Sequence, residues 1–387
     1  MNKKYSIFIT AAFCLFIFGF GAAFFILPDR DFSPQENRYL SQFTPLKLGK
    51  LVPGADFGQG GNLFNGKFME DFEDYVVDQF PLRDSWVHLK AWSERLSGKQ
   101  ENNKVYFGTD GQTLFAQFPA LTDEELATRV GYVNQLADNL IVPVYFSLIP
   151  DKSYVWADRL PANAPLVDDG SLLDRAAALC SDWVTWIDLK DVLNGDDVFY
   201  RTDHHWSTMG AYRGYLALSL GMGGSGAVLD YEPELRSDAF YGTTWSSSGA
   251  AWISPDSIYT LIPEGGLLGN TTVTRYPEGS PVPGSLYDLT KLAEKDKYSM
   301  FLGGNQPLCV IENPDAQGGR LLVIRDSYSD SLAPFLSLDY QQVHLFDPRY
   351  NNISISQYVE DNGIDQVLVL YSASNFSTDQ NIFKLAR

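Results

Sequence analysis

The chain has 387 residues, enough at roughly 150 residues per domain for two or three domains or for one large α/β domain with attachments. Hydrophobic residues make up 45% and aromatic residues 14%, which excludes disorder and coiled coil as descriptions of the whole. With 29 basic and 48 acidic residues the formal net charge is −19, so most of the surface would repel a polyanion, and no nucleic acid is expected as a partner.

An uncharged apolar run over residues 7–27 follows Lys3 and Lys4. At about 1.5 Å per residue it reaches roughly the 30 Å needed to cross a bilayer, and the two lysines favour a cytoplasmic N-terminus. A cleaved signal peptide is the alternative, but its apolar region is normally shorter and ends in a small-residue site, whereas this run ends in Phe-Phe-Ile-Leu. We expect an uncleaved, single-pass anchor in the cell membrane, with the rest of the chain extracytoplasmic.

Three cysteines are present, and Cys14 lies in the predicted span. An oxidising compartment permits a disulfide between the other two, Cys180 and Cys309. Two unpaired thiols are an equal alternative, because the sequence gives no Cα separation.

Residues 28–61 are rich in Pro, Gly and polar residues and indicate a stalk. Apolar residues at helical spacing from residue 63 onward predict an amphipathic helix that Pro81 ends, and a second helix is predicted over 84–96. The chain is therefore divided into an anchor (1–27), a stalk with a helical lead-in segment (28–105) and an α/β domain (106–387).

Helices and apolar runs alternate in the rest of the chain. Thr122 and Glu125 form a capping-box pattern ahead of a helix over 123–139. Alternation of this kind predicts parallel strands with helices on both faces. The stretch over about 221–300, rich in Gly, Ser, Pro and Thr, is expected to be an inserted loop or β region with a functional role. The other predicted strands are 142–149, 184–189, 321–324, 343–346 and 366–370, and the other helices lie near 172–180, 331–338 and 354–362.

Two of the four histidines are adjacent, in Thr202-Asp203-His204-His205-Trp206-Ser207. Ser207 is a predicted N-cap, which places this segment in a turn ahead of a helix. A carboxylate two residues from an imidazole can accept one ring N–H there and fix the tautomer of a general base.

A second candidate segment, Arg325-Asp326-Ser327-Tyr328-Ser329, directly follows the predicted strand over 321–324. The carboxyl ends of strands are where ligands bind in open α/β sheets, and backbone N–H groups at the next helix can stabilise an oxyanion. Ser327, supplied with a base, is therefore a candidate nucleophile.

Four further motifs accompany these two segments: Gly303-Gly304-Asn305, Asp347-Pro348-Arg349-Tyr350, Glu36-Asn37-Arg38-Tyr39-Leu40 and Lys104-Val105-Tyr106-Phe107-Gly108. Together with Asp203-His204-His205-Trp206 and Arg325-Asp326-Ser327-Tyr328, they resemble the bacterial DHHW family, which is similar to the SGNH-hydrolase-like domains of alginate O-acetyltransferases. Arg325 stands where many relatives have lysine, and Pro348 interrupts what is more often Asp-Leu-Arg-Tyr.

The resemblance implies an SGNH-hydrolase-like parallel sheet with helices on both faces. Ser327 would be the nucleophile, His205 its base and Asp203 the group that orients His205. The oxyanion hole would combine the Ser327 N–H with Gly304 and Asn305. This chemistry requires no metal and no organic cofactor.

Each remaining candidate has a structural alternative. Gly304 and Asn305 also suit a tight turn. Arg349 could contact a substrate carboxylate or form a salt bridge, and Lys152, after a predicted strand, could contact substrate or be a solvated charge. His204 and Trp206 are further candidates for substrate binding.

The Asp-His-His segment has two other interpretations. It could be a polar turn whose histidines satisfy nearby backbone groups. Alternatively, Asp203, His204, His205 and Asp326 could bind zinc or manganese, although adjacent histidines point apart in an extended strand.

The predicted function is acyl, most simply acetyl, transfer to or removal from a cell-surface or secreted polysaccharide. By resemblance, a membrane-bound O-acyltransferase partner could supply the acyl group. The alternative is a non-catalytic glycan-binding or polysaccharide-assembly protein on the same fold, with Trp245, Trp252 and Tyr259 as aromatic platforms.

Overall fold

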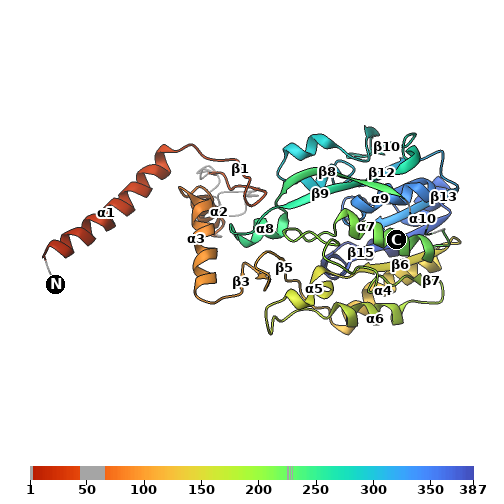
Figure 1. Cartoon of the computed structure of the whole chain (residues 1–387), viewed down its shortest axis with the longest axis horizontal. Coiled ribbons are helices and arrows are strands. Elements are labelled where there is room, and N and C mark those ends of the chain that lie inside the picture. The colour runs from red at the N-terminus through yellow and green to blue at the C-terminus, as the bar shows by residue number, and fades with distance from the viewer. Residues whose placement is uncertain (1–2, 44–65, 225, 227, 229) are drawn as a thin grey trace, which may run out of the picture. The chain divides into compact units, whose positions relative to one another are not determined.

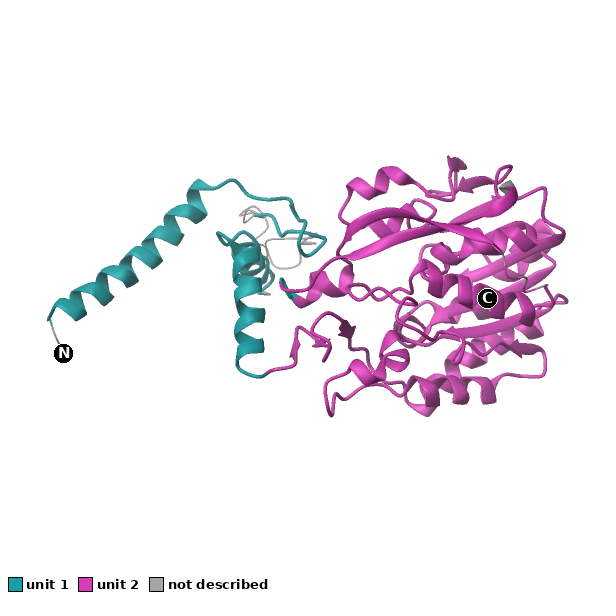
Figure 2. Cartoon of the chain, viewed as in Figure 1, with its two compact units in different colours: residues 1–98, 249–251 teal, residues 99–248, 252–387 magenta. Residues whose placement is uncertain are grey.

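The computed structural model describes residues 3–43, 66–224, 226, 228 and 230–387. It forms two compact units: residues 1–98 with 249–251, and residues 99–248 with 252–387 (Figure 2). Residues 44–61 of the predicted stalk and the predicted helix start at 63–65 lie outside the described residues.

The first unit contains the predicted apolar helix, α1 (Lys3–Ile26), which in the described part of the chain is the one helix long and apolar enough to cross a membrane. After the short strands β1 (Phe32–Ser33) and β2 (Arg38–Tyr39) come α2 (Lys67–Asp78) and α3 (Arg83–Leu96). Arg38 of the Glu36–Leu40 motif bonds to the Asp78 carboxylate at the end of α2. That motif therefore ties β2 to α2.

The second unit is built on one sheet, in which the described residues form eight strands in the order β11-β10-β12-β14-β13-β15-β6-β7. In Figure 1 the labelled strands of this sheet run from β10 near the top of the unit, past β12, β13 and β15, to β6 and β7. Their bounds are β6 Val144–Ile149, β7 Val184–Trp186, β10 Thr272–Arg275, β11 Val282–Gly284, β12 Leu308–Glu312, β13 Gly318–Arg325, β14 Tyr340–Phe346 and β15 Gln366–Ser372.

The prediction of a parallel sheet holds for the five strands from β14 to β7. The sequence did not predict β12, β10 and β11 as members of this sheet, and they extend the β14 edge in antiparallel pairs. These three strands are only 3 to 5 residues long, so the strand-helix alternation did not reveal them.

Helices cover both faces of the sheet, as predicted. Successive residues of a strand face opposite sides, so Leu321 and Val323 of β13 pack in one core with α7 (Thr208–Gly221) and α9 (Ser329–Asp339). Leu322 and Ile324 pack in the other core, which contains residues of α4 (Asp123–Asp138), α6 (Asp169–Leu179), α10 (Ile355–Asn362) and α11 (Ala373–Thr378). The capping box of α4 is present as predicted.

The predicted insertion is a mixture of β structure and short helices. Its main feature is the antiparallel pair β8 (Tyr231–Phe240) and β9 (Asp256–Pro263), with α8 (Thr243–Ser248) between them. A three-stranded sheet and one turn of helix complete this part of the unit: β3 Glu101–Asn102, β4 Val105–Phe107, β5 Leu114–Ala116 and α5 Lys152–Val155.

The cysteines of this unit are unpaired. Cys309 lies in the core on one face of the sheet, and Cys180 packs against the core on the other. Burial raises the pKa of both thiols, to about 11 for Cys180 and about 12 for Cys309. Of the two alternatives left open by the sequence, free thiols are the one observed.

Candidate active site

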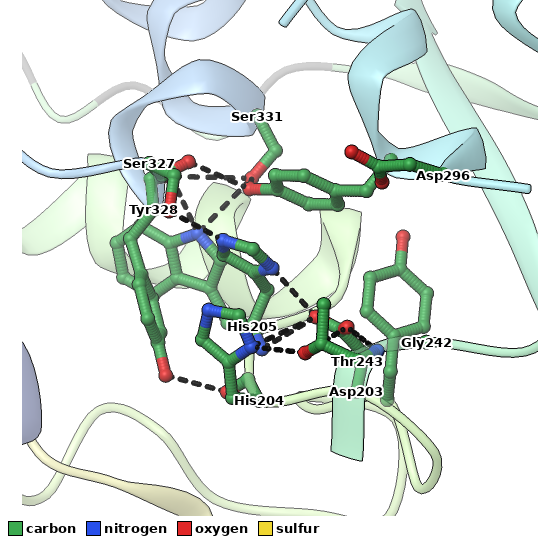
Figure 3. A network of polar contacts seen from close by, with 12 residues as sticks. Asp203, His204, His205, Gly242, Thr243, Asp296, Ser327, Tyr328 and Ser331 are labelled. Carbon is green, nitrogen blue, oxygen red and sulfur yellow. Dashed lines mark hydrogen bonds and ion pairs between the residues drawn. The ribbon is translucent and has the colours of Figure 1, made fainter. Parts of the chain in front are cut away.

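Asp203, His205 and Ser327 form one hydrogen-bonded chain (Figure 3). His205 Nδ1 lies 2.5 Å from Asp203 Oδ1, and His205 Nε2 lies 2.8 Å from Ser327 Oγ, although 122 residues separate the last two in sequence. Their exposed fractions are 1% for Asp203, 6% for His205 and 9% for Ser327. A hydroxyl, an imidazole and a carboxylate in this sequence of contacts can activate the hydroxyl as a nucleophile.

The Asp203 carboxylate accepts hydrogen bonds at both oxygens. Oδ1 accepts from the His205 N–H at 3.0 Å as well as from the ring, while Oδ2 accepts from the Thr243 N–H at 2.7 Å and from Thr243 Oγ1 at 2.9 Å. Burial by itself would raise the pKa of Asp203, but the neighbouring imidazoles and these donors hold it well below its usual value. An ionised Asp203 makes His205 Nδ1 the donor, which leaves Nε2 to accept from Ser327.

The ring of Tyr298 packs against the imidazole of His205. The two rings stack with centroids 3.8 Å apart and planes 9° from parallel. The Tyr298 hydroxyl donates to the Ser327 carbonyl at 3.2 Å and contacts Ser331 Oγ at 3.0 Å. One aromatic side chain thus positions both the base and the backbone of the nucleophile.

Ser327 lies between the end of β13 and the start of α9, as the sequence predicted. The neighbouring Asp326 fixes this turn, because its carboxylate accepts from the backbone N–H groups of Tyr328 at 3.0 Å and Ser372 at 2.8 Å and from Asn375 Nδ2 at 2.8 Å. Asp326 therefore joins the ends of β13 and β15, and both of its carboxylate oxygens are occupied by these hydrogen bonds.

Lys152 holds the loop that carries Asp203. Its ammonium is buried and donates to the carbonyls of Tyr200, Arg201 and Asp203 at 3.1, 3.1 and 2.6 Å. On the other side of the loop, the Thr202 N–H donates to Asp256 of β9 at 2.7 Å. The alternative of a solvated charge at Lys152 is therefore wrong, because the three carbonyls replace its water.

Trp206 is a core residue, which corrects the expectation of substrate binding. Its side chain is fully buried, and its Nε1–H donates to the Tyr328 carbonyl at 2.9 Å and to Ser331 Oγ at 3.0 Å. Helix α7 packs directly against the Trp206 indole, since a Cβ on Gly214 would lie 2.7 Å from that ring. Ser207 caps α7 by accepting from the Gly210 N–H, as predicted.

The other predicted contact residues have structural partners. Arg349 forms a two-point salt bridge with Asp347, at 2.9 and 2.7 Å. Gly304 has φ +88° and donates its N–H to the Phe301 carbonyl, as a tight turn requires. Asn305 Oδ1 accepts from the buried Arg325 at 3.2 Å. Within the described residues no hydrogen bond joins Gly304 or Asn305 to Ser327.

His204 is the residue of the Asp-His-His segment whose side chain is partly exposed and lines a cavity. Its side chain is 33% exposed, its Nδ1 lies 2.7 Å from Thr243 Oγ1, and it lines a cavity of about 390 Å³ in the second unit.

Ligand atoms of Asp203, His204 and His205 lie within 4.8 Å of one another, close enough to consider a metal ion. Hydrogen bonds use both nitrogens of His205 and one of His204. The donor set therefore fits a proton relay better than a metal centre.

Thr243 and Tyr298 are the site residues that sequence reasoning missed. Both come from the inserted region, where no motif marks them. Gly242 offers the one local hint, because a Cβ there would lie 2.2 Å from Asp203 Cβ. Only glycine lets the chain pass so close to the carboxylate.

The sheet, its two helical layers and the serine at the end of β13 resemble the fold of an SGNH hydrolase-like α/β domain. Consistent with this class, residues 119–222 match the family model of the SGNH hydrolase-like domain of the acetyltransferase AlgX. Residues 184–346 match the model of the DHHW proteins, which confirms the resemblance carried by Asp203 to Trp206.

Individual relatives agree with these matches. The probable alginate O-acetylase AlgJ of Pseudomonas aeruginosa is 28% identical over 195 residues, which are 46% of this chain and 50% of AlgJ, so the chain spans about half the length of that relative. A DHHW family protein from Eubacterium siraeum has a TM-score of 0.61 at 20% identity, covering 74% of this chain and 95% of its own. Bacillus cereus PatB1 has a TM-score of 0.62 at 23% identity, with coverages of 72% and 97%. These two structures share the fold.

Proposed function

We propose that this protein transfers an acetyl group to, or removes one from, a hydroxyl of a cell-surface or secreted polysaccharide. The observation that carries the proposal is the buried chain from Ser327 through His205 to Asp203. The likeness to the alginate O-acetylase AlgJ supports acetyl as the group and polysaccharide as the substrate class.

In the proposed reaction, Ser327 Oγ attacks the acetyl carbonyl and passes its proton to His205 Nε2. His205 returns the proton to the departing oxygen, and acetyl remains on Ser327 as an ester. A sugar hydroxyl or water then gives its proton to His205, takes the acetyl group and releases Ser327. Asp203 pairs with the imidazolium, and the Ser327 N–H is the oxyanion donor retained from the sequence prediction.

The proposed location follows from α1, which would anchor the protein with its catalytic unit extracytoplasmic. A membrane-bound O-acyltransferase would then be a suitable acetyl donor, since it could pass acetyl groups across the bilayer. Whether sugar or water accepts the group decides between transferase and esterase.

The alternative glycan-binding role depends on exposed aromatic platforms, and two of the three expected platforms pack against other side chains. Lys295 Nζ lies 4.3 Å from the ring centroid of Trp245, and Trp252 packs on Phe107 with centroids 5.0 Å apart. Of the three expected platforms, only Tyr259 remains substantially exposed, at 43%.

The test is Ser327→Ala, compared with Ser329→Ala as a matched control. Ser329 is also buried, and its Oγ has no hydrogen-bond partner in the described part of the chain. Acetyl release from an acetylated polysaccharide should fall on the order of 10³-fold or more in Ser327→Ala and stay near wild type in Ser329→Ala. Equal activity of the two variants would contradict the proposal.

A further inference from the structure

The hydrogen bonds around Thr243 fix the proton on His204. An ionised Asp203 can only accept, so Thr243 Oγ1 must donate its single proton to Asp203 Oδ2 at 2.9 Å. The same oxygen lies 2.7 Å from His204 Nδ1, so that contact must be donated by His204. Neutral His204 therefore carries its proton on Nδ1 and a lone pair on Nε2.

That lone pair has no hydrogen-bond partner among the residues the structure describes. Figure 3 shows one nitrogen of the His204 ring directed at Thr243 and the other, without a dashed line, on the far edge of the ring. Partial burial and the neighbouring His205 imidazole lower the pKa of His204, so the ring stays neutral at physiological pH.

The space beside His204 suits a sugar ring. The cavity of about 390 Å³ that His204 lines also presents hydroxyl groups and aromatic rings, the combination that fixes and covers a small polar ligand. Its hydroxyl and aromatic lining includes Thr243, Thr244, Ser247, Ser374, Phe115 and Phe118.

The two imidazoles are close enough to act on one ligand, since their ring centroids are 3.9 Å apart. The His205 Nε2 atom serves the reacting hydroxyl by way of Ser327. A second acceptor beside the reacting hydroxyl can receive a hydrogen bond from the neighbouring hydroxyl of the same sugar ring.

We propose that His204 Nε2 accepts a hydrogen bond from the hydroxyl adjacent to the one that gains or loses acetyl, so that the site selects a vicinal diol. This inference rests on the proposed function. The ester bond to Ser327 breaks, the new ester forms on the reacting oxygen, and its proton returns to Ser327 through His205. The adjacent hydroxyl keeps its proton, and His204 only orients the acceptor.

The test uses p-nitrophenyl acetate as donor and compares cyclohexane-1,2-diol with cyclohexanol as acceptors. In the wild type, kcat/KM for acetyl transfer to the diol should exceed that for cyclohexanol about 10-fold or more, because the site's acceptor would face no donor in the mono-alcohol. His204→Asn, whose amide can still donate to Thr243 but lacks a group at Nε2, should reduce this preference to about 2-fold or less. A purely structural role would lower both rates and leave their ratio unchanged.

Two further variants sharpen the result. His204→Gln places an amide near Nε2 and should retain part of the preference, whereas His88→Asn makes the matched change in the first unit and should retain all of it. A wild type that forms acetyl-Ser327 but shows no preference for the diol overturns this inference and leaves the proposed function standing. A wild type that neither transfers nor hydrolyses acetyl overturns both.

Discussion

The Asp203 carboxylate organises the site at the scale of single residues. It accepts four hydrogen bonds, two from His205 and two from Thr243. A buried charge is tolerable when its lone pairs are satisfied in this way. The same bonds fix the tautomers of both histidines, so the function of each ring depends on the charge of Asp203.

Asp203→Asn should therefore disable the site without unfolding it. An amide can donate to His205 Nδ1, which would move the ring proton to Nε2 and leave no acceptor for Ser327. We expect kcat for acetyl-ester hydrolysis to fall on the order of 10⁴-fold, the loss that the equivalent substitution causes in a serine protease triad. The assay should be paired with a thermal melt, and activity within 10-fold of wild type in a folded variant would contradict this role.

Metal removal tests the other interpretation of the same residues. Because hydrogen bonds already use three of the four imidazole nitrogens, dialysis against EDTA should leave acetyl-ester hydrolysis unchanged. Loss of activity that zinc or manganese restores would favour a metal centre instead.

At the scale of elements, the site depends on how closely α5, β9 and α8 approach the loop that carries Asp203. Lys152 of α5 and Asp256 of β9 hold the loop at Asp203, and the N-terminus of α8 supplies Thr243. Gly242 permits this approach, since an added Cβ would lie 2.3 Å from Asp203 Oδ2.

Gly242→Ala should consequently displace Asp203 or α8. We expect acetyl-ester hydrolysis to fall about 10-fold or more, because a misplacement of about 1 Å in a catalytic group can cost two orders of magnitude. Gly131→Ala in α4 is the matched control, since nothing lies within 4 Å of its added Cβ. The control should keep full activity and gain up to about 1 kcal/mol in the free energy of unfolding. Equal activity of the two variants would show that the approach at Gly242 is unimportant.

At the scale of the whole molecule, a buried carboxyl pair makes stability depend on pH. The Asp151 N–H donates to Asp169 Oδ2 at 2.8 Å, and burial raises the pKa of Asp151 to about 7 and that of Asp169 to about 8. The unfolded chain loses these protons near pH 4, whereas the folded protein keeps them to higher pH. The free energy of unfolding should therefore fall as pH rises from about 4 to about 8.

Asp169→Asn should remove part of this dependence, because the amide oxygen can still accept from the Asp151 N–H without becoming charged. At pH 8 the variant should melt about 1–3 °C above wild type, and at pH 5 the two should melt together. Asp182→Asn makes the same change at an exposed residue and should shift neither melt. An equal shift of Asp169→Asn at both pH values would show that its charge is not the cause.

The parts of this protein that its sequence determined are those encoded by neighbouring residues. Uninterrupted apolar runs predicted α1 and the core of β13, and a capping box ahead of a helical pattern predicted α4. Local spacing placed Asp203 beside His205 and Ser327 at a strand end. These features follow from backbone hydrogen bonds and side-chain directions within one segment.

Only the tertiary structure decided which distant groups meet. It joined Ser327 to His205, assigned Trp206 and Lys152 to support of the site, and brought Thr243 and Tyr298 into it from the insertion. It also added three antiparallel strands to the parallel sheet. The physical reason is that the partner of a buried polar group is chosen by the packing of separate segments, and no spacing along the chain encodes that packing.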